Sequence, residues 1–296
     1  MFVSKNDLAS VKSYFQKKLP NLSSSEINLM VKYLTIKRLR INETDFLVNQ
    51  PFLFSESDLL FFRDAVKRMQ NNEPFQHILG EVEFYNLLLK CDSRALIPRP
   101  ETEELVDWIV SSFNASDKLQ IADLCAGSGC IALALISSLV KSQVVAVELS
   151  QDAIDLMREN ATQTNGSIDI EKMDVLSDDF SRFEKDSFDC WVSNPPYIPL
   201  EEKNRMDANV LDYEPDMALF VENDNALMFY ERIAKLATTY LKSSGYLFFE
   251  IHEDLAKETI ALLEELNFVN IELRKDLQGK DRMIKAQKLS SQNESE

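Results

Sequence analysis

The sequence predicts an α/β protein with a doubly wound, mainly parallel sheet of seven strands, preceded by a small all-α domain. Apolar stretches of strand length alternate with helical patterns from residue 98 to residue 289, which is typical of a sheet covered by helices on both faces. Two ligand-binding patterns follow strands within this region, as expected at the carboxyl edge of such a sheet. Residues 1–75 show apolar residues at helical spacing, which predicts the second, helical domain.

The helical domain begins its helices with clear capping signals. Ser23 and Glu26 have the spacing of a capping box, and Ser55 is placed to cap a further helix. A basic cluster consists of Lys37, Arg38 and Arg40. Two interpretations remain open for this cluster: a solvated helix end, or a contact patch for an acidic protein partner.

Residues 76–97 are predicted to form a β-hairpin linker, residues 98–289 the larger domain, and residues 290–296 a disordered polar tail. The strands of the larger domain are expected at 121–124, 144–148, 168–172, 188–193, 245–251, 268–273 and 283–288. Helices are expected between them, near 129–140, from Ser150 to about Gly166, at 224–242 and at 253–266.

A glycine turn follows the first of these strands. The stretch Cys125-Ala126-Gly127-Ser128-Gly129 leads directly into an apolar helix, whose first turn offers free N–H groups. Glycine allows the backbone to approach a ligand closely and to adopt positive φ. Glu148 ends the next strand, about twenty residues on, where a carboxylate can accept hydrogen bonds from ribose hydroxyls. The spacing predicts a nucleotide-type cofactor without naming it.

The stretch Ser193-Asn194-Pro195-Pro196-Tyr197 ends the strand at 188–193. Two consecutive prolines fix the backbone and cannot continue a β-ladder. The Asn194 side-chain oxygen and the Pro195 carbonyl can each accept one N–H, and the Tyr197 ring can lie against a planar group. The tip is therefore predicted to seat a planar NH₂ group, which favours a methyl donor over a hydride donor as the cofactor.

Composition restricts the classes of partner. The net charge of −17 argues against a nucleic-acid substrate, because phosphate contacts need clustered Lys and Arg. Residues 1–75 carry 11 Lys and Arg against 8 Asp and Glu, a net charge of +3, so the remainder carries −20. No transmembrane segment, signal peptide or metal-binding pattern is recognisable. The four cysteines form no C-x-x-C pair, which indicates reduced thiols in a cytoplasmic protein.

These motifs together resemble the HemK/PrmC family of class I, Rossmann-like S-adenosylmethionine-dependent methyltransferases. The resemblance covers about residues 70–288 and rests on five stretches: Phe75-Gln-His-x-x-Gly80-Glu81, Ile97-Pro-Arg-Pro-Glu-Thr102, Asp123-Leu-x-x-Gly-Ser-Gly129, Asn194-Pro-Pro-Tyr197 and Tyr213-Glu-Pro215. It implies transfer of a methyl group to the side-chain amide of the glutamine in the Gly-Gly-Gln loop of peptide chain release factors. It also implies that the helical domain helps to hold the release factor.

The resemblance implies a role for each motif residue. Residues 125–129 would hold the methionine and ribose parts of S-adenosylmethionine, Glu148 the ribose, and Asp174 with Val175 the adenine. Asn194, Pro195, Pro196 and Tyr197 would hold the glutamine amide, and Asn194 would also contact the cofactor. Cys125 departs from the family, which usually has glycine there, so positive φ at this position would cost stability or cofactor affinity.

Three alternatives remain open at the level of sequence. A glutamine methyltransferase acting on a ribosomal protein would share most motifs. A nucleic-acid amino methyltransferase would share Asn194-Pro-Pro-Tyr197, although the negative charge counts against it. A cofactor-binding adaptor without activity would be consistent with Cys125.

Overall fold

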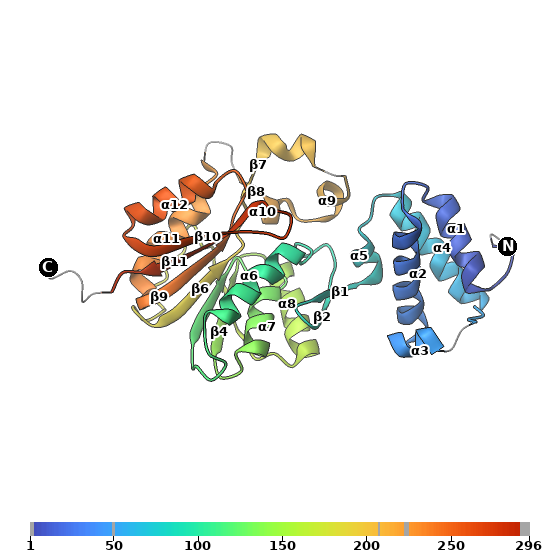
Figure 1. The fold of residues 1–296 in the computed structure, drawn as a ribbon, viewed down its shortest axis with the longest axis horizontal. Coiled ribbons are helices and arrows are strands. Elements are labelled where there is room, and N and C mark those ends of the chain that lie inside the picture. The colour runs from blue at the N-terminus through green and yellow to red at the C-terminus, as the bar shows by residue number, and fades with distance from the viewer. Residues whose placement is uncertain (1–2, 49–50, 207, 222–224, 291–296) are drawn as a thin grey trace. The chain divides into compact units, whose positions relative to one another are not determined.

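The computed structural model describes residues 3–48, 51–206, 208–221 and 225–290, so most of the predicted tail at 290–296 lies outside the described residues. The chain divides into two compact units, one of residues 1–81 with 207–213 and one of residues 82–206 with 214–296. Figure 1 shows the helices of the first unit and the sheet of the second.

The first unit is built from helices around one apolar core. Its helices are α1 (Leu8–Lys18), α2 (Ser24–Leu39), α3 (Glu43–Val48), α4 (Glu56–Gln70), α5 (Phe75–Leu79) and α9 (Ala208–Tyr213). Both predicted caps are present, because Ser23 and Ser55 each accept a backbone N–H at the start of a helix. Helix α5 occupies the start of the stretch predicted as linker, and only residues 81–84 and 87–90 form the two-stranded hairpin β1 (Glu81–Phe84) and β2 (Leu87–Lys90).

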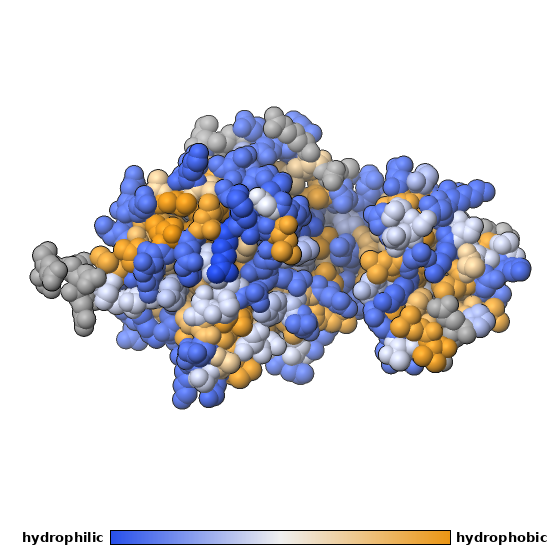
Figure 2. Space-filling view, in the orientation of Figure 1, coloured by the Kyte–Doolittle hydropathy of each residue, from blue (hydrophilic) through white to orange (hydrophobic). Residues whose placement is uncertain are grey.

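The basic cluster of the first unit is largely neutralised. Arg38 donates to Asp58 at 2.7 Å and to Ser57 at 3.0 Å, and Lys37 lies 3.3 Å from Glu81. These contacts favour a solvated helix end over a contact patch for an acidic protein partner. An apolar surface group lies instead around α3, where Leu47 and Val48 are 69% and 74% exposed (Figure 2).

The second unit contains the predicted seven-stranded sheet. Its strands are, in spatial order, β10 (Phe268–Lys275), β11 (Asp281–Lys288), β9 (Leu241–Glu250), β6 (Phe188–Ser193), β3 (Gln120–Leu124), β4 (Gln143–Glu148) and β5 (Asp169–Lys172). Only β11 runs antiparallel to its neighbours. The sheet is mainly parallel, as the sequence predicts.

Helices cover both faces of this sheet, because successive side chains of each strand point to opposite faces. Trp191 packs in the core beneath α11 (Met228–Tyr240) and α12 (Ala256–Glu265). Its neighbours Cys190 and Val192 pack in the core beneath α6 (Pro100–Ser111), α7 (Cys130–Ser138) and α8 (Gln151–Thr164). The same alternation in β3 and β9 makes the sheet doubly wound. Among the described helices, none combines the length and apolar character needed to cross a bilayer.

The segment between Tyr197 and residue 224, in which no strand or helix was expected from the sequence, contains regular structure. It forms β7 (Ile198–Pro199), the 3₁₀ helix η1 (Leu200–Arg205), α9, α10 (Asp216–Leu219) and β8 (Phe220–Val221), which pairs with β7. Pro199 and Pro215 precede two of the short helices, which suits a residue that cannot continue a strand. Strand β9 also begins earlier than predicted, because Leu241 already pairs with Phe188.

Candidate active site

The two motifs meet at the centre of the sheet. Strands β3 and β6 are neighbours, and the chain turns to one side after β3 and to the other after β6, so their carboxyl ends form the switch point where α/β sheets bind ligands. Leu124 pairs with Ser193 at these ends, and the buried Ser193 hydroxyl donates to the Leu124 carbonyl at 2.6 Å. The glycine turn and Asn194 therefore begin side by side.

A cavity of about 380 Å³ opens at this point, within the range of ordinary small-molecule sites. Residues that line it from the motifs are Cys125, Ala126, Gly127, Ser128, Glu148, Asp174, Val175, Asn194 and Pro196, joined by Arg94, Arg99, Thr102, Met217, Phe220 and Phe229, among others. Gly129 lies at the first residue before α7, as its N-cap. Pro195 and Tyr197 lie outside this lining, as far as the described residues define it.

The glycine turn has the conformation that its composition predicts. Cys125, Gly127 and Gly129 have φ values of +60°, +53° and +78°. A Cβ placed on Gly127 would meet no atom within 4 Å, so its backbone faces open space, whereas one on Gly129 would lie 2.5 Å from Met157 Cγ. Gly127 thus leaves room for a ligand, and Gly129 allows α8 to pack closely.

We expect Cys125→Gly to leave the free energy of unfolding unchanged or to raise it by up to about 1 kcal/mol. A left-handed conformation costs an L-residue about 1–2 kcal/mol, whereas glycine costs up to about 1 kcal/mol through unfolded-state entropy. Denaturant melts without and with S-adenosylhomocysteine measure the free energy of unfolding and the stabilisation that the ligand adds. A clear loss of stability in the variant would show that the turn has adapted to cysteine.

Burial, with the charge of Glu148, raises the pKa of the Cys125 thiol, so the residue stays protonated.

Glu148 accepts three backbone N–H groups besides lining the cavity. Its Oε2 accepts from Gly127 N at 2.8 Å, and its Oε1 accepts from Leu149 N at 2.9 Å and Ser150 N at 2.8 Å. It therefore joins the glycine turn to the start of α8. A carboxylate has about four acceptor positions, so capacity for a ligand hydroxyl remains.

Asp174 and Val175 lie after β5 in a turn that is held by hydrogen bonds between its own residues. Asp174 accepts from Leu176 N at 2.9 Å and from Ser177 Oγ at 2.8 Å. Arg232 of α11 donates to the Val175 carbonyl at 3.1 Å. Both residues line the cavity from the β5 side, and their contact with adenine stays a prediction.

The Asn194 tip connects to two residues that sequence reasoning did not select. Asn194 Nδ2 lies 3.3 Å from Thr102 Oγ1, and the Thr102 hydroxyl donates to Glu250 Oε2 at 2.7 Å. Tyr197 donates to the other oxygen, Glu250 Oε1, at 3.4 Å and packs edge to face with His252. The only sequence signal for Glu250 is a carboxylate that ends an apolar strand, and Thr102 stood inside a motif without a role of its own.

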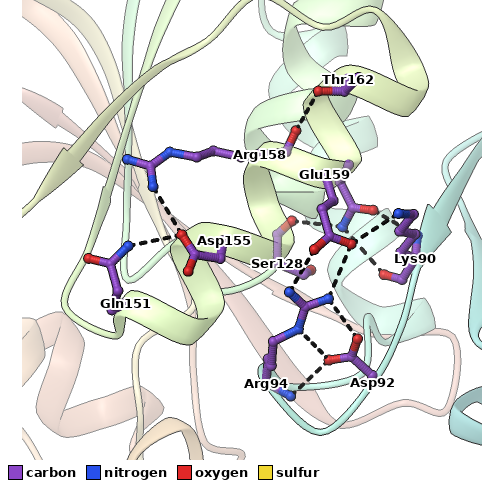
Figure 3. A network of polar contacts seen from close by, with 10 residues as sticks. Lys90, Asp92, Arg94, Ser128, Gln151, Asp155, Arg158, Glu159 and Thr162 are labelled. Carbon is purple, nitrogen blue, oxygen red and sulfur yellow. Dashed lines mark hydrogen bonds and ion pairs between the residues drawn. The ribbon is translucent and has the colours of Figure 1, made fainter.

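Two ion-pair groups hold the cavity wall. The buried Glu214 accepts from Arg99 at 2.6 Å and from Ile97 N at 3.0 Å, which ties the segment before α6 to the segment before α10. Figure 3 shows Glu159 between Lys90 and Arg94, and Arg94 between Asp92 and Glu159. The hydrogen bond from Arg94 is the main cause that lowers the pKa of Glu159 to about 2.

Burial raises the pKa of Glu250 to about 7, while the Thr102 hydrogen bond and Arg282 oppose the rise. A pKa above the unfolded value of 4.5 means that the contribution to stability is present below pH 4.5 and is lost as pH rises through about 7. We expect the melting temperature of the wild type to fall more between pH 5 and pH 8 than that of Glu250→Gln. Parallel melting curves for the two proteins would contradict this, and the exposed substitution Glu258→Gln serves as the control.

Comparisons with known proteins agree with this geometry. Residues 13–80 match the PrmC N-terminal domain model, and residues 105–211 match the methyltransferase small domain model. The release factor glutamine methyltransferase of Flavobacterium psychrophilum is 40% identical over 250 residues, which cover 83% of this chain and 86% of that protein. That of Bacteroides thetaiotaomicron is 34% identical over 277 residues, covering 93% and 98%. A solved methyltransferase structure from Pyrococcus furiosus shares the fold, with a TM-score of 0.52 and 13% identity over 76% of this chain and 98% of that one.

The matches to the methyltransferase small domain model and to these relatives, together with the doubly wound sheet and the cavity at its switch point, identify a methyltransferase that uses S-adenosylmethionine as methyl donor. The chain belongs to the release factor glutamine methyltransferase family.

Proposed function

We propose that the protein transfers a methyl group from S-adenosylmethionine to the side-chain amide nitrogen of the glutamine in the Gly-Gly-Gln loop of peptide chain release factors. The observation that carries the proposal is the position of Asn194 at the same cavity as the glycine turn, on neighbouring strands. Membership of the family supports the substrate.

The proposed cofactor contacts follow the cavity wall. Cys125, Ala126, Gly127, Ser128 and Gly129 would hold the methionine and ribose parts. Glu148 would accept from the ribose, and Asp174 with Val175 would flank the adenine. The residues fit S-adenosylmethionine, since the backbone at Gly127 faces open space and Glu148 can still accept a hydrogen bond from a ribose hydroxyl.

When bound, S-adenosylmethionine supplies an electrophilic methyl group on a sulfonium. The protein's task is to align the amide nitrogen, and alignment contributes roughly 7–11 kcal/mol in well-oriented reactions. Asn194 Oδ1 and the Pro195 carbonyl would accept the two N–H groups and stabilise the positive charge that grows on nitrogen. Pro196 would shape the wall, and Tyr197 would support the tip through Glu250. No strong general base is needed, because the N-methylated amide nitrogen is very acidic before it loses its proton.

The helical unit is proposed to hold the release factor, with the exposed apolar side chains Leu47, Val48 and Leu53 as a contact surface. Direct contact with nucleic acid or membrane is not part of the proposal. The free cysteines favour a reducing compartment, the cytoplasm.

Incubation with labelled S-adenosylmethionine and purified release factors tests the proposal. We expect label on the Gly-Gly-Gln glutamine and none on a release factor in which that glutamine is alanine. Parallel arms with ribosomal proteins and with nucleic acid test the two alternative substrates. Cofactor binding without transfer to any of them would favour an inactive adaptor.

A further inference from the structure

The two ends of the Asn194 side-chain amide have nearly the same shape but opposite hydrogen-bonding character. The proposed function needs Oδ1, the acceptor, to face the substrate NH₂ group. A side chain turned by 180° would present Nδ2–H groups instead and would favour a carboxylate. Steric packing distinguishes oxygen from nitrogen poorly, so hydrogen-bond partners have to set the orientation.

With Glu250 Oε2 unprotonated, the partners of Asn194 have one consistent arrangement of protons. The Thr102 hydroxyl has a single proton, and at 2.7 Å it donates this proton to Glu250 Oε2. Its oxygen can then only accept from the Asn194 side chain, which lies 3.3 Å away, so the near end of the amide must be Nδ2. Thr102 and Glu250 are each 2% exposed, so bulk water does not compete for these positions.

The fold fixes this arrangement from three separate elements. Thr102 lies in the first turn of α6. Glu250 ends β9, which pairs with β6 so that Phe249 lies beside Ser193, one residue before Asn194. Tyr197 occupies Glu250 Oε1, which leaves Oε2 for Thr102. A proton on Oε1 leaves Oε2 an acceptor, whereas a proton on Oε2 would be donated to Thr102 and would turn the amide. The inferred orientation therefore belongs to Glu250 with Oε2 unprotonated, as it is in the ionised form above the pKa of about 7.

We propose that Thr102 and Glu250 are positioning residues that orient the Asn194 amide and thereby make the site select a glutamine amide over a glutamate carboxylate. The inference rests on the proposed function for the identity of the substrate. The chain of donors runs from Asn194 Nδ2–H to Thr102 and from the Thr102 hydroxyl to Glu250. It turns Oδ1 away from Thr102, on a side chain that lines the cavity.

The test compares Thr102→Val, which keeps the shape without the hydroxyl, with Thr102→Ser, which keeps the hydroxyl. We expect Thr102→Val to lower kcat for release-factor methylation about tenfold, the size that one neutral hydrogen bond contributes, and Thr102→Ser to stay within about twofold of wild type. Affinity for S-adenosylhomocysteine should be unchanged in both. Thr259→Val, which removes a buried hydroxyl from α12, is the matched control and should retain full activity.

Selectivity gives a readout that a merely structural role would not move. A release factor with Gly-Gly-Glu in place of Gly-Gly-Gln should be a weak competitive inhibitor when the wild-type enzyme methylates the normal release factor. Its inhibition should become severalfold stronger with the Thr102→Val enzyme and should stay weak with Thr102→Ser. Full activity and selectivity in Thr102→Val, or equal losses in the Val and Ser variants, would overturn the inference.

A spectroscopic measurement separates this inference from the proposed function. The side-chain NH₂ signal of Asn194, assigned by its loss in Asn194→Ala, should show one proton protected from exchange in wild type and Thr102→Ser. Equal exchange of both protons in wild type would contradict the inference even if methylation is observed. Protection without methylation of any release factor would leave the orientation supported and reject the proposed function.

Discussion

Asn194→Ala will lower the single-turnover rate of methyl transfer to a release factor by on the order of 10²–10³, the usual effect of removing one preorganised electrostatic partner. The fold should remain intact, because Pro195 and Pro196 still fix the backbone and Thr102 can still donate to Glu250. Affinity for S-adenosylhomocysteine should fall only modestly. The measurement is a rapid-quench assay with enzyme in excess over substrate.

Asn194→Asp is expected to be impaired but measurable. The carboxylate keeps an acceptor for the substrate, but it places a charge at a site for a neutral amide, so desolvation opposes the gain. It also removes the donor to Thr102, whose only proton is directed to Glu250. The exposed substitution Asn114→Ala should behave as wild type. Wild-type rates for Asn194→Ala would show that the amine is held elsewhere, and the proposed role of the tip would fall.

Glu148→Ala should weaken the binding of S-adenosylhomocysteine by roughly 1.5–3 kcal/mol, the value of a hydrogen bond to a charged group. The loss can exceed this range, because Glu148 also accepts from Gly127 N and so helps to hold the glycine turn. Calorimetry on the wild type and the variant measures the difference, and Glu258→Ala controls for removal of a carboxylate. Unchanged affinity in Glu148→Ala would reject the ribose contact.

The two effects of Glu148 can be separated with a ligand that lacks the ribose hydroxyls. A 2′,3′-dideoxy analogue of S-adenosylhomocysteine should bind the wild type less tightly than the parent ligand. Glu148→Ala should bind the two ligands with more similar affinity, because the partner of the hydroxyls is gone. An equal difference between the ligands in both proteins would assign the whole effect to the loop.

The sequence by itself determined the order of the helices and strands and the spacing of apolar residues within them. Local patterns carry this information, since apolar runs of strand length and helical spacing depend only on near neighbours. Seven strands, the capping residues Ser23 and Ser55, and the positions of Gly127 and Asn194 at strand ends were therefore predictable. The sequence left open whether Cys125 is left-handed, and the structure shows that it is, with φ of +60°.

Only the tertiary structure decided which strand ends lie together and which buried polar groups meet there. Thr102 and Glu250 are 148 residues apart in sequence, and no local pattern pairs them. Their contact exists because β9 lies beside β6 and α6 packs against β9, so the orientation of Asn194 is fixed by long-range packing. Glu148 also accepts from Gly127 N, 21 residues away in sequence, and the spacing alone did not reveal this bond. The short helices after Tyr197 likewise show no periodic pattern in the sequence. The motifs thus specified the chemical groups of the site, and packing between distant segments specified how those groups point.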